Sequence, residues 1–230
     1  MFHPEQILFE DNHIIIVNKK SSQIVQGDKT GDKPLSELIK DYLKEKYQKP
    51  GNIFLGVVHR LDRPVSGVII FAKTSKALSR LNEMLRQHQI KKTYWAICTN
   101  PPKENSGQLI HYMKKNESNN KSFAIEQAKD GYLKAVLNYK HIASSEKYHL
   151  LEINLETGRH HQIRVQLSKI GCTIKGDLKY GAARSNDDAS ISLHARIIEL
   201  IHPVSKEKIH ITAPTPKDNL WTFFEKQLNH

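Results

Sequence analysis

A carboxylate placed between two guanidinium groups is the feature of this 230-residue chain best suited to chemistry. The segment HRLDRPVSG, residues 59–67, lies between two apolar runs at 53–58 and 68–72. The neighbouring arginines favour the ionised form of Asp62, and a loop held between rigid strands is a common place for catalytic groups. The pattern indicates a carboxylate able to act as a nucleophile or base, with a solvated turn aspartate as the alternative.

A second dense polar cluster, TGRHHQIRVQL, occupies residues 157–167 and predicts a helix that opens at Thr157-Gly158-Arg159 and ends at Gly171. Arg164 stands between two apolar residues of this helix, so we expect its guanidinium to border a core. A guanidinium in that position commonly has a carboxylate partner. The alternative is an arginine on the helix surface, in contact with water.

Metal and redox chemistry find little support in the sequence. His160 and His161 are adjacent, and neighbouring positions of a helix diverge by about 100 degrees, so we expect no shared metal ion. Cys98 and Cys172 are isolated and lack the paired spacing of a zinc or redox motif. We therefore expect no metal and no cofactor, and a chain of the reducing cytoplasm.

The charge of the chain favours a polyanionic partner. Lys and Arg number 35 against 24 Asp and Glu, which gives a formal net charge of +11 and a pI near 9.5. Nucleic acid is the usual partner of such an excess, and a generic lysine-rich surface is the alternative. No apolar run approaches the ~20 residues that span a bilayer, so we expect no membrane segment and no signal peptide.

Hydrophobic periodicity predicts an α+β fold in which a mixed, largely antiparallel central sheet is flanked by helices and loops. We expect one domain over residues 1–230, made of two subdomains that share one sheet. The polar stretch at 101–120 reads as a flexible insertion, and 21–33 as a loop. Strands are expected at 7–10, 14–17, 53–58, 68–72, 93–98, 123–127, 133–141, 148–155, 191–201 and 208–212, and helices after Pro34, after Thr74, after Thr157 and over 217–228.

Taken together, these segments resemble the RluA family of pseudouridine synthases, over about residues 6–216. The resemblance depends on several motifs that occur in the family's order and at similar separations. One departure is Lys19-Lys20-Ser21-Ser22, since the family usually has Lys-Pro and a Gly after its first hairpin. The matching segments are His59-Arg60-Leu61-Asp62 with Ser66-Gly67 and Ala72-Lys73, Lys92-Thr93-Tyr94-Trp95-Ala96, residues 157–167, Gly176-Asp177 with Tyr180-Gly181, and Leu193-His194-Ala195 with His202-Pro203.

The resemblance implies the pseudouridine synthase catalytic fold, with a central RNA-binding cleft, and isomerisation of uridine to pseudouridine in RNA. By the same resemblance Asp62 is the catalytic carboxylate, Tyr94 stacks on the uracil, and Arg164 pairs with Asp62 to keep it charged. No group enters or leaves in this reaction, so it demands no cofactor or metal. Asp62 attacks the sugar or the base, or removes a sugar proton; the sequence leaves these routes open.

The implied substrate is a uridine in structured RNA, a ribosomal or transfer RNA stem-loop, which must be flipped out of its stack. The resemblance suggests that Arg60 fills the vacated space. Many members carry an N-terminal RNA-binding appendage; because the matching segments begin within the first ten residues here, we expect this chain to lack it, and a monomer is the default expectation. Two rival hypotheses are a noncatalytic RNA-binding protein on the same scaffold and a hydrolase using Ser66 or Asp62 with a histidine. The residues expected to contact RNA are His59, Arg60, Arg63, Lys73, Lys92, Arg159, His161 and Gln162.

Overall fold

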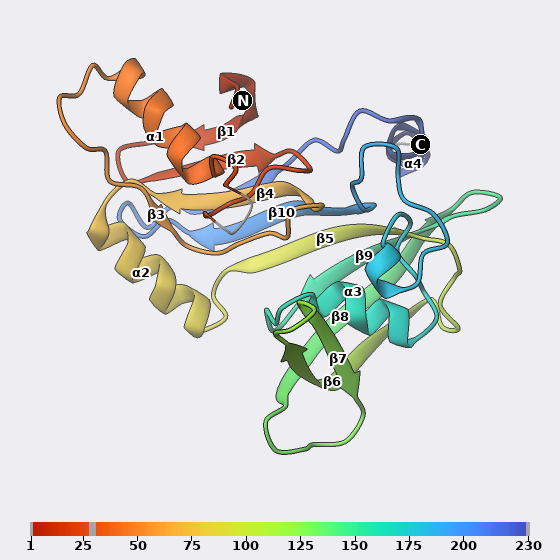
Figure 1. Ribbon diagram of the computed structural model, residues 1–230. Helices are drawn as coiled ribbons and strands as arrows, with labels where there is room; N and C mark the ends of the chain where they lie inside the picture. The colour runs from red at the N-terminus through yellow and green to blue at the C-terminus, as the bar shows by residue number, and fades with distance from the viewer. Residues whose placement is uncertain (1, 28–30, 229–230) are drawn as a thin grey trace. The chain divides into compact units, whose positions relative to one another are not determined.

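The computed structural model describes residues 2–27 and 31–228, which form two compact units (Figure 1). Unit 1 comprises Met1–Ile90 and Ala195–Pro214, and unit 2 comprises Lys91–His194 and Thr215–His230. Part of the loop expected at 21–33, namely 28–30, lies outside the described residues. Strands outnumber helices in both units, and the α+β class expected from the sequence is confirmed.

Unit 1 is built around β2, a strand paired on both edges whose Ile-Ile-Ile-Val run is fully buried. Strand β2 pairs antiparallel with β1 and with β4, and β10 is the next neighbour of β4. β3 pairs with the C-terminal end of β4, at Phe71 and Ala72, and β11 pairs with β10. The elements of unit 1 are η1 (Pro4–Gln6), β1 (Ile7–Glu10), β2 (Ile14–Lys19), α1 (Leu35–Lys46), β3 (Gly56–Val57), β4 (Ser66–Ala72), α2 (Ser75–Arg86), β10 (Leu193–Ile201, of which the part from Ala195 onward belongs to unit 1) and β11 (Lys208–Thr212).

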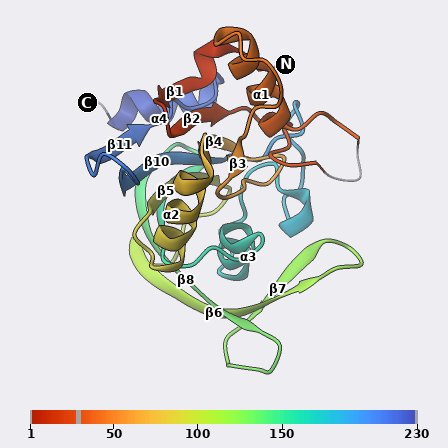
Figure 2. The same cartoon turned by 90° about the vertical axis from the view of Figure 1, so that its left-hand side faces the viewer.

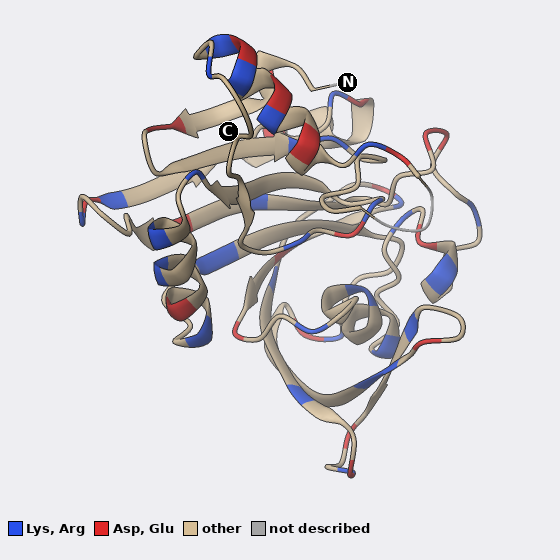
Figure 3. Cartoon of the chain, turned by 60° about the vertical axis from the view of Figure 1, so that its left-hand side comes forward, with Lys and Arg blue, Asp and Glu red and all other residues tan. Residues whose placement is uncertain are grey.

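The helices of unit 1 begin where the sequence predicts them. Pro34 directly precedes α1, and the hydroxyl of Thr74 caps α2 by accepting a hydrogen bond from the Ala77 amide at 3.2 Å. Both helices bury one apolar face and expose a charged one. Figure 3 shows mainly Lys and Arg along α2, whereas α1 carries charges of both signs.

Unit 2 is a curved sheet of the order β5-β9-β8-β6-β7, in which neighbouring strands run antiparallel. In Figures 1 and 2, α3 lies over its concave face beside β6 and β7. The helix α4 packs against β5 and β9 through Trp221 and Phe224. The elements are β5 (Lys91–Cys98), β6 (Ser106–Asn116), β7 (Lys121–Ile125), β8 (Leu133–Ser144), β9 (His149–Leu155), α3 (Gln162–Lys169), η2 (Leu178–Tyr180) and α4 (Asn219–Leu228).

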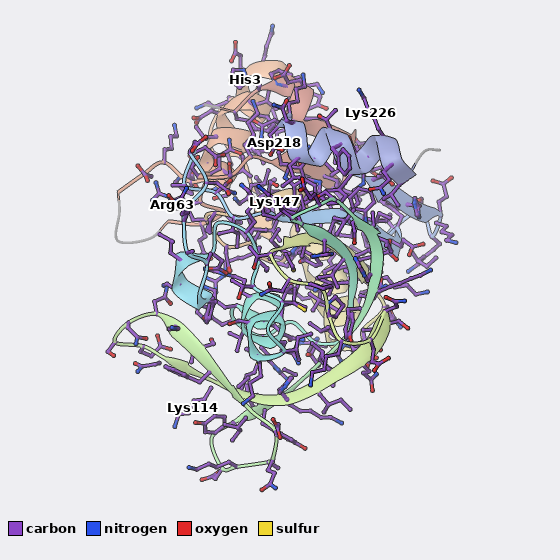
Figure 4. All side chains as sticks on the ribbon, turned by 90° about the vertical axis from the view of Figure 1, so that its right-hand side faces the viewer. His3, Arg63, Lys114, Lys147, Asp218 and Lys226 are labelled. Carbon is purple, nitrogen blue, oxygen red and sulfur yellow. The ribbon has the colours of Figure 1, made fainter. Side chains whose placement is uncertain are left out.

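The prediction of a loop at 101–120 is wrong, because most of this stretch forms strand β6. β6 pairs along its length with β8 and, at its far end, with β7, so residues 117–120 form the turn of a hairpin. Its side chains are mostly polar because much of the strand is exposed. A strand with little buried surface lacks the apolar alternation that sequence patterns detect. Lys114, labelled in Figure 4, lies on this hairpin.

Candidate active site

Asp62 lies in unit 1 on the connection between β3 and β4. The amide of Val65 donates a hydrogen bond to the Asp62 carbonyl at 3.1 Å, which closes a tight turn around Arg63 and Pro64. The Asp62 side chain is neither buried nor fully exposed. The expected strand at 53–58 is shortened to β3, Gly56–Val57, so the approach to this turn is largely irregular. The carboxylate is therefore presented by a hydrogen-bonded loop, as the sequence predicts.

Lys19, the last residue of β2, binds the backbone of this loop. Its side chain is fully buried, and its ammonium group donates hydrogen bonds to the carbonyls of Lys20, Arg63 and Val65 at 3.0, 3.2 and 2.6 Å. Burial lowers the pKa of Lys19 to about 7, against the opposing effect of the negative charge of Asp62. The lysine fixes the backbone on both sides of Pro64, so it positions the segment that carries Asp62.

Gly67 fixes the loop where it enters β4. Its φ is +117°, and an added Cβ would lie 2.3 Å from the carbonyl oxygen of Ala195 and 2.4 Å from its nitrogen. Only glycine permits this approach of two backbones. The preceding Ser66 is buried, which places its hydroxyl away from solvent and argues against the hydrolase hypothesis that uses it as a nucleophile.

Three of the predicted RNA-contacting residues flank Asp62 on the same loop. Arg60 is exposed, and His59 is half-buried with its Nε2 accepting a hydrogen bond from the Ile70 amide at 3.3 Å. Arg63, labelled in Figure 4, is exposed and forms an ion pair with Asp32 at 2.7 Å. Both side chains of this ion pair are about half exposed, so Asp32 competes only weakly with a phosphate group for the Arg63 guanidinium.

Lys73 has a structural partner. Its ammonium group lies 2.7 Å from Glu10 and donates to the Asp11 carbonyl at 2.5 Å, and its side chain is about one-tenth exposed. Although burial raises the pKa of Glu10, hydrogen bonds from Lys46 and Lys73 lower it to about 2. Lys73 therefore holds the β1–β2 turn against the end of β4 rather than standing on an open surface.

Tyr94 and Lys92 lie in unit 2 on strand β5. Tyr94 is 6% exposed and stands opposite Ile153 of β9. Lys92 is half-buried, and burial lowers its pKa. An added Cβ at Gly158 would lie 3.7 Å from Lys92 Nζ, so this ammonium group adjoins the turn before α3.

The turn before α3 is organised by Gln162. Its Oε1 accepts hydrogen bonds from the Thr157 hydroxyl at 2.8 Å and the Arg159 amide at 2.9 Å, and its Nε2 donates to the Val136 carbonyl at 3.1 Å. Gln162 is buried, so its amide serves the protein's own backbone. Arg159 is exposed and precedes the helix, which begins at Gln162 rather than at 159.

The two adjacent histidines do not diverge as expected. His161 adopts a left-handed conformation with φ of 56° as the N-cap of α3, and its ring stacks on that of His160 with centroids 3.7 Å apart. The helical angle therefore does not apply to this pair. His161 Nδ1 lies 2.7 Å from the Tyr180 hydroxyl, and burial, with the positive charge of Arg164, lowers the pKa of His161 to about 2. A neutral, buried imidazole is a poor phosphate ligand.

Arg164 borders a core and has a carboxylate partner, both as expected. It is 5% exposed and forms two parallel hydrogen bonds with Asp177, from Nε at 2.7 Å and from Nη2 at 2.8 Å. The Tyr180 ring lies 5.1 Å from the guanidinium carbon. The sequence alone does not identify Asp177 as the partner, although Gly176-Asp177 is one of the segments that match the family. The expected pairing of Arg164 with Asp62, which belongs to the other unit, stays a prediction.

Residues 2–27 and 31–228 hold no group of three or more His, Cys, Asp and Glu side chains suited to a metal ion. The same ranges contain no helix long and apolar enough to cross a membrane.

Comparison with known proteins identifies the fold and the family. A family model described as RNA pseudouridylate synthase matches residues 13–169. The chain is 33% identical over 215 residues to an uncharacterized RNA pseudouridine synthase, YhcT, of Bacillus subtilis, covering 92% of this chain and 69% of that protein. It is 32% identical over 226 residues to the ribosomal large subunit pseudouridine synthase D of Zymomonas mobilis, covering 94% and 70% respectively.

A solved structure, human RNA pseudouridylate synthase domain containing 4, covers 98% of this chain and 93% of that one, with a TM-score of 0.79 and 22% identity. It shares the fold, and the sequence matches above carry the family. The resemblance seen in the sequence motifs is thereby confirmed. The chain belongs to the RNA pseudouridylate synthase family, whose members isomerise uridine in RNA, and it is an isomerase that acts on RNA.

Proposed function

We propose that Asp62 is the catalytic carboxylate with which this chain converts a uridine of structured RNA to pseudouridine. The observation that carries the proposal is the support of its loop. A buried ammonium group binds the backbone at Arg63 and Val65, and Gly67 packs against Ala195. A carboxylate held on a fixed backbone is preorganised for attack or for proton removal.

The reaction itself needs a positioned carboxylate and no added group. The bond between uracil N1 and the ribose C1′ breaks, a bond from uracil C5 to C1′ forms, and the C5 proton is lost while N1 gains one. The composition of the RNA does not change, so no redox partner is consumed.

Tyr94 and Arg164 are proposed as partners of Asp62 in the reaction, because both stand at the positions that the family motifs give them. Tyr94 offers a ring for stacking and a hydroxyl for proton movement. Arg164 is held rigidly by Asp177, and a guanidinium held in this way has a defined direction. The experiment that separates their roles from folding compares Tyr94→Phe with Tyr94→Leu, since only the first keeps the ring.

The central experiment uses Asp62→Asn with in vitro transcribed, unmodified ribosomal large-subunit RNA and transfer RNA. We expect no pseudouridine from this variant, while its affinity for the same RNA stays within about tenfold of the wild type. Asp41→Asn, on the exposed side of α1, is the matched control and keeps full activity. Pseudouridine formation by Asp62→Asn at the wild-type rate removes this residue from the mechanism.

Arg60, His59, Arg63, Lys92 and Arg159 are the proposed RNA contacts, since each is exposed or half-buried. Lys73, His161 and Gln162 are left out because their polar groups bind other parts of the protein. Phosphate contacts release counterions, so affinity must fall with added salt. Replacing one exposed arginine, such as Arg159 by Ala, should reduce the slope of log affinity against log salt by about one.

The target, the compartment and the assembly complete the proposal. We propose a ribosomal or transfer RNA stem-loop as substrate, since one relative is named a ribosomal large subunit pseudouridine synthase. We propose a cytoplasmic location, in line with two free, buried cysteines, and a monomer as the default assembly. Mapping pseudouridines across the transcriptome of a strain that lacks this protein names the target, and the absence of any lost site contradicts the proposal.

A further inference from the structure

An open pocket of about 510 Å³ lies in unit 1 beside the loop that carries Asp62. Its lining combines the apolar residues Leu55, Val57 and Val58 with Ser36, Glu37 and Lys40 from the first turns of α1. Arg60 stands at its edge. Pockets of ~300–1,000 Å³ commonly hold small organic molecules, so this one has room for a nucleotide base.

The pocket lies close to the proposed catalytic group along the chain. Arg60 is two residues ahead of Asp62, so their Cα atoms are at most about 7 Å apart. His59, between the pocket wall and Arg60, is tied to strand β4 through the Ile70 amide. The wall and the Asp62 turn therefore belong to one short, anchored segment.

The polar lining of the pocket offers groups that a ligand can use. Ser36 is 6% exposed, and within the described residues its hydroxyl makes no hydrogen bond. Glu37 binds Lys40 at 2.8 Å, but both side chains are partly exposed, so this pair is weak. An incoming donor can share or replace the ammonium group at the Glu37 carboxylate. A pocket lined by apolar side chains together with a hydroxyl and a carboxylate suits the flat face and polar edge of a nucleobase.

We propose that this pocket receives the base of a nucleotide next to the target uridine, and that Glu37 selects a base with an exocyclic amino group. Carboxylates accept hydrogen bonds from such amino groups, as they do from cytosine N4. Uracil has no exocyclic amino group, and the N3–H donor on its polar edge lies between two carbonyl oxygens that repel a carboxylate. The pocket therefore favours adenine, cytosine or guanine over uracil at one position. The inference rests on the proposed function, since it assigns a neighbour to the reacting uridine.

The test uses a pool of RNA hairpins with a fixed stem and a loop whose central residue is uridine and whose other positions are random. The pool is incubated with wild type, Glu37→Gln and Glu45→Gln, a control at an exposed position of the same helix. Sequencing gives the bases in the RNA retained by each protein and, separately, the molecules converted to pseudouridine at the centre. Retention needs no turnover, so it reports on the pocket even where catalysis fails.

The wild type should disfavour uracil about tenfold at one position adjacent to the central uridine, and Glu45→Gln should behave in the same way. In Glu37→Gln the bias should fall to about twofold or less, because an amide can also donate to a carbonyl oxygen. A wild type without bias in its retained RNA, or a bias unchanged in Glu37→Gln, overturns the pocket assignment. Retained RNA that shows the bias but contains no pseudouridine instead contradicts the proposed function and leaves the pocket intact.

Discussion

Gly67→Ala tests whether the contact between Gly67 and Ala195 fixes the loop that carries Asp62. The added methyl group would lie 2.3 Å from a backbone oxygen, whereas ordinary contacts of a Cβ begin near 3.4 Å. One backbone must therefore move by about 1 Å. Overpacking of this kind costs about 1–3 kcal/mol, and a left-handed φ adds about 1–2 kcal/mol for any residue with a Cβ. We expect the free energy of unfolding to fall by the sum of these two costs, about 2–5 kcal/mol.

Gly51→Ala is the matched control, because it separates the clash from the backbone preference. Gly51 also belongs to unit 1 and has a φ of +83°, but an added Cβ there would meet nothing within 4 Å. Its substitution should cost only the about 1–2 kcal/mol of the left-handed conformation. The comparison therefore isolates the contact with Ala195.

The assay is urea unfolding followed by far-ultraviolet circular dichroism, since both tryptophans, Trp95 and Trp221, lie in unit 2 and report on that unit alone. Pseudouridine formation is measured on the same samples under conditions in which each variant is folded. We expect Gly67→Ala to lose most activity and Gly51→Ala to keep it. Equal destabilisation of the two variants would refute the argument that the backbone contact, rather than φ, makes this glycine necessary.

Three further predictions concern buried charges and salt. Burial holds the pKa of Lys19 at about 7, against 10.5 in the unfolded chain, so the unfolded state binds more protons between these values. The unfolding free energy should therefore rise from pH 7 to 10 by about 1.4 kcal/mol per pH unit relative to Lys19→Met, and parallel curves in chemical denaturation would contradict this. Asp177→Asn removes the charge that pairs with Arg164 and should cost about 3–5 kcal/mol in thermal or urea unfolding; a loss below 1 kcal/mol argues that the guanidinium has another sufficient partner. RNA affinity measured by filter binding should fall at least tenfold between 50 and 200 mM salt, and a flat response points away from phosphate contacts.

The elements with clear hydrophobic periods were predictable from sequence, and the exposed ones were not. Strands such as β2 and β9 bury alternating or continuous apolar residues, and α1 and α2 each show one apolar face. β6 exposes most of its residues, so its order comes from backbone pairing with β8, which leaves no mark in a single sequence. The same reason explains why 101–120 reads as a loop.

In the candidate site, too, features set by neighbouring residues could be predicted from the sequence, whereas contacts between distant residues could not. The loop around Asp62, the burial of Arg164 and its need for a carboxylate all follow from neighbouring residue types. Asp177 as the partner does not, because the pairing depends on how the chain returns after α3. The burial of Lys19 was not predictable either, because it follows the continuous apolar run of β2 and its carbonyl partners Arg63 and Val65 lie more than 40 residues further along the chain.

The backbone contact between Gly67 and Ala195 joins two residues that the ribosome adds at very different times. Gly67 leaves the ribosome long before its neighbour, since every strand of unit 2 is translated between them. At ~5–20 residues per second this interval is on the order of ten seconds. During that time β4 has no β10 beside it, and the part of that edge that β3 does not pair with is available to other chains. The nascent protein should accordingly depend on chaperones until β10 emerges, and a stalled chain ending before residue 195 should aggregate.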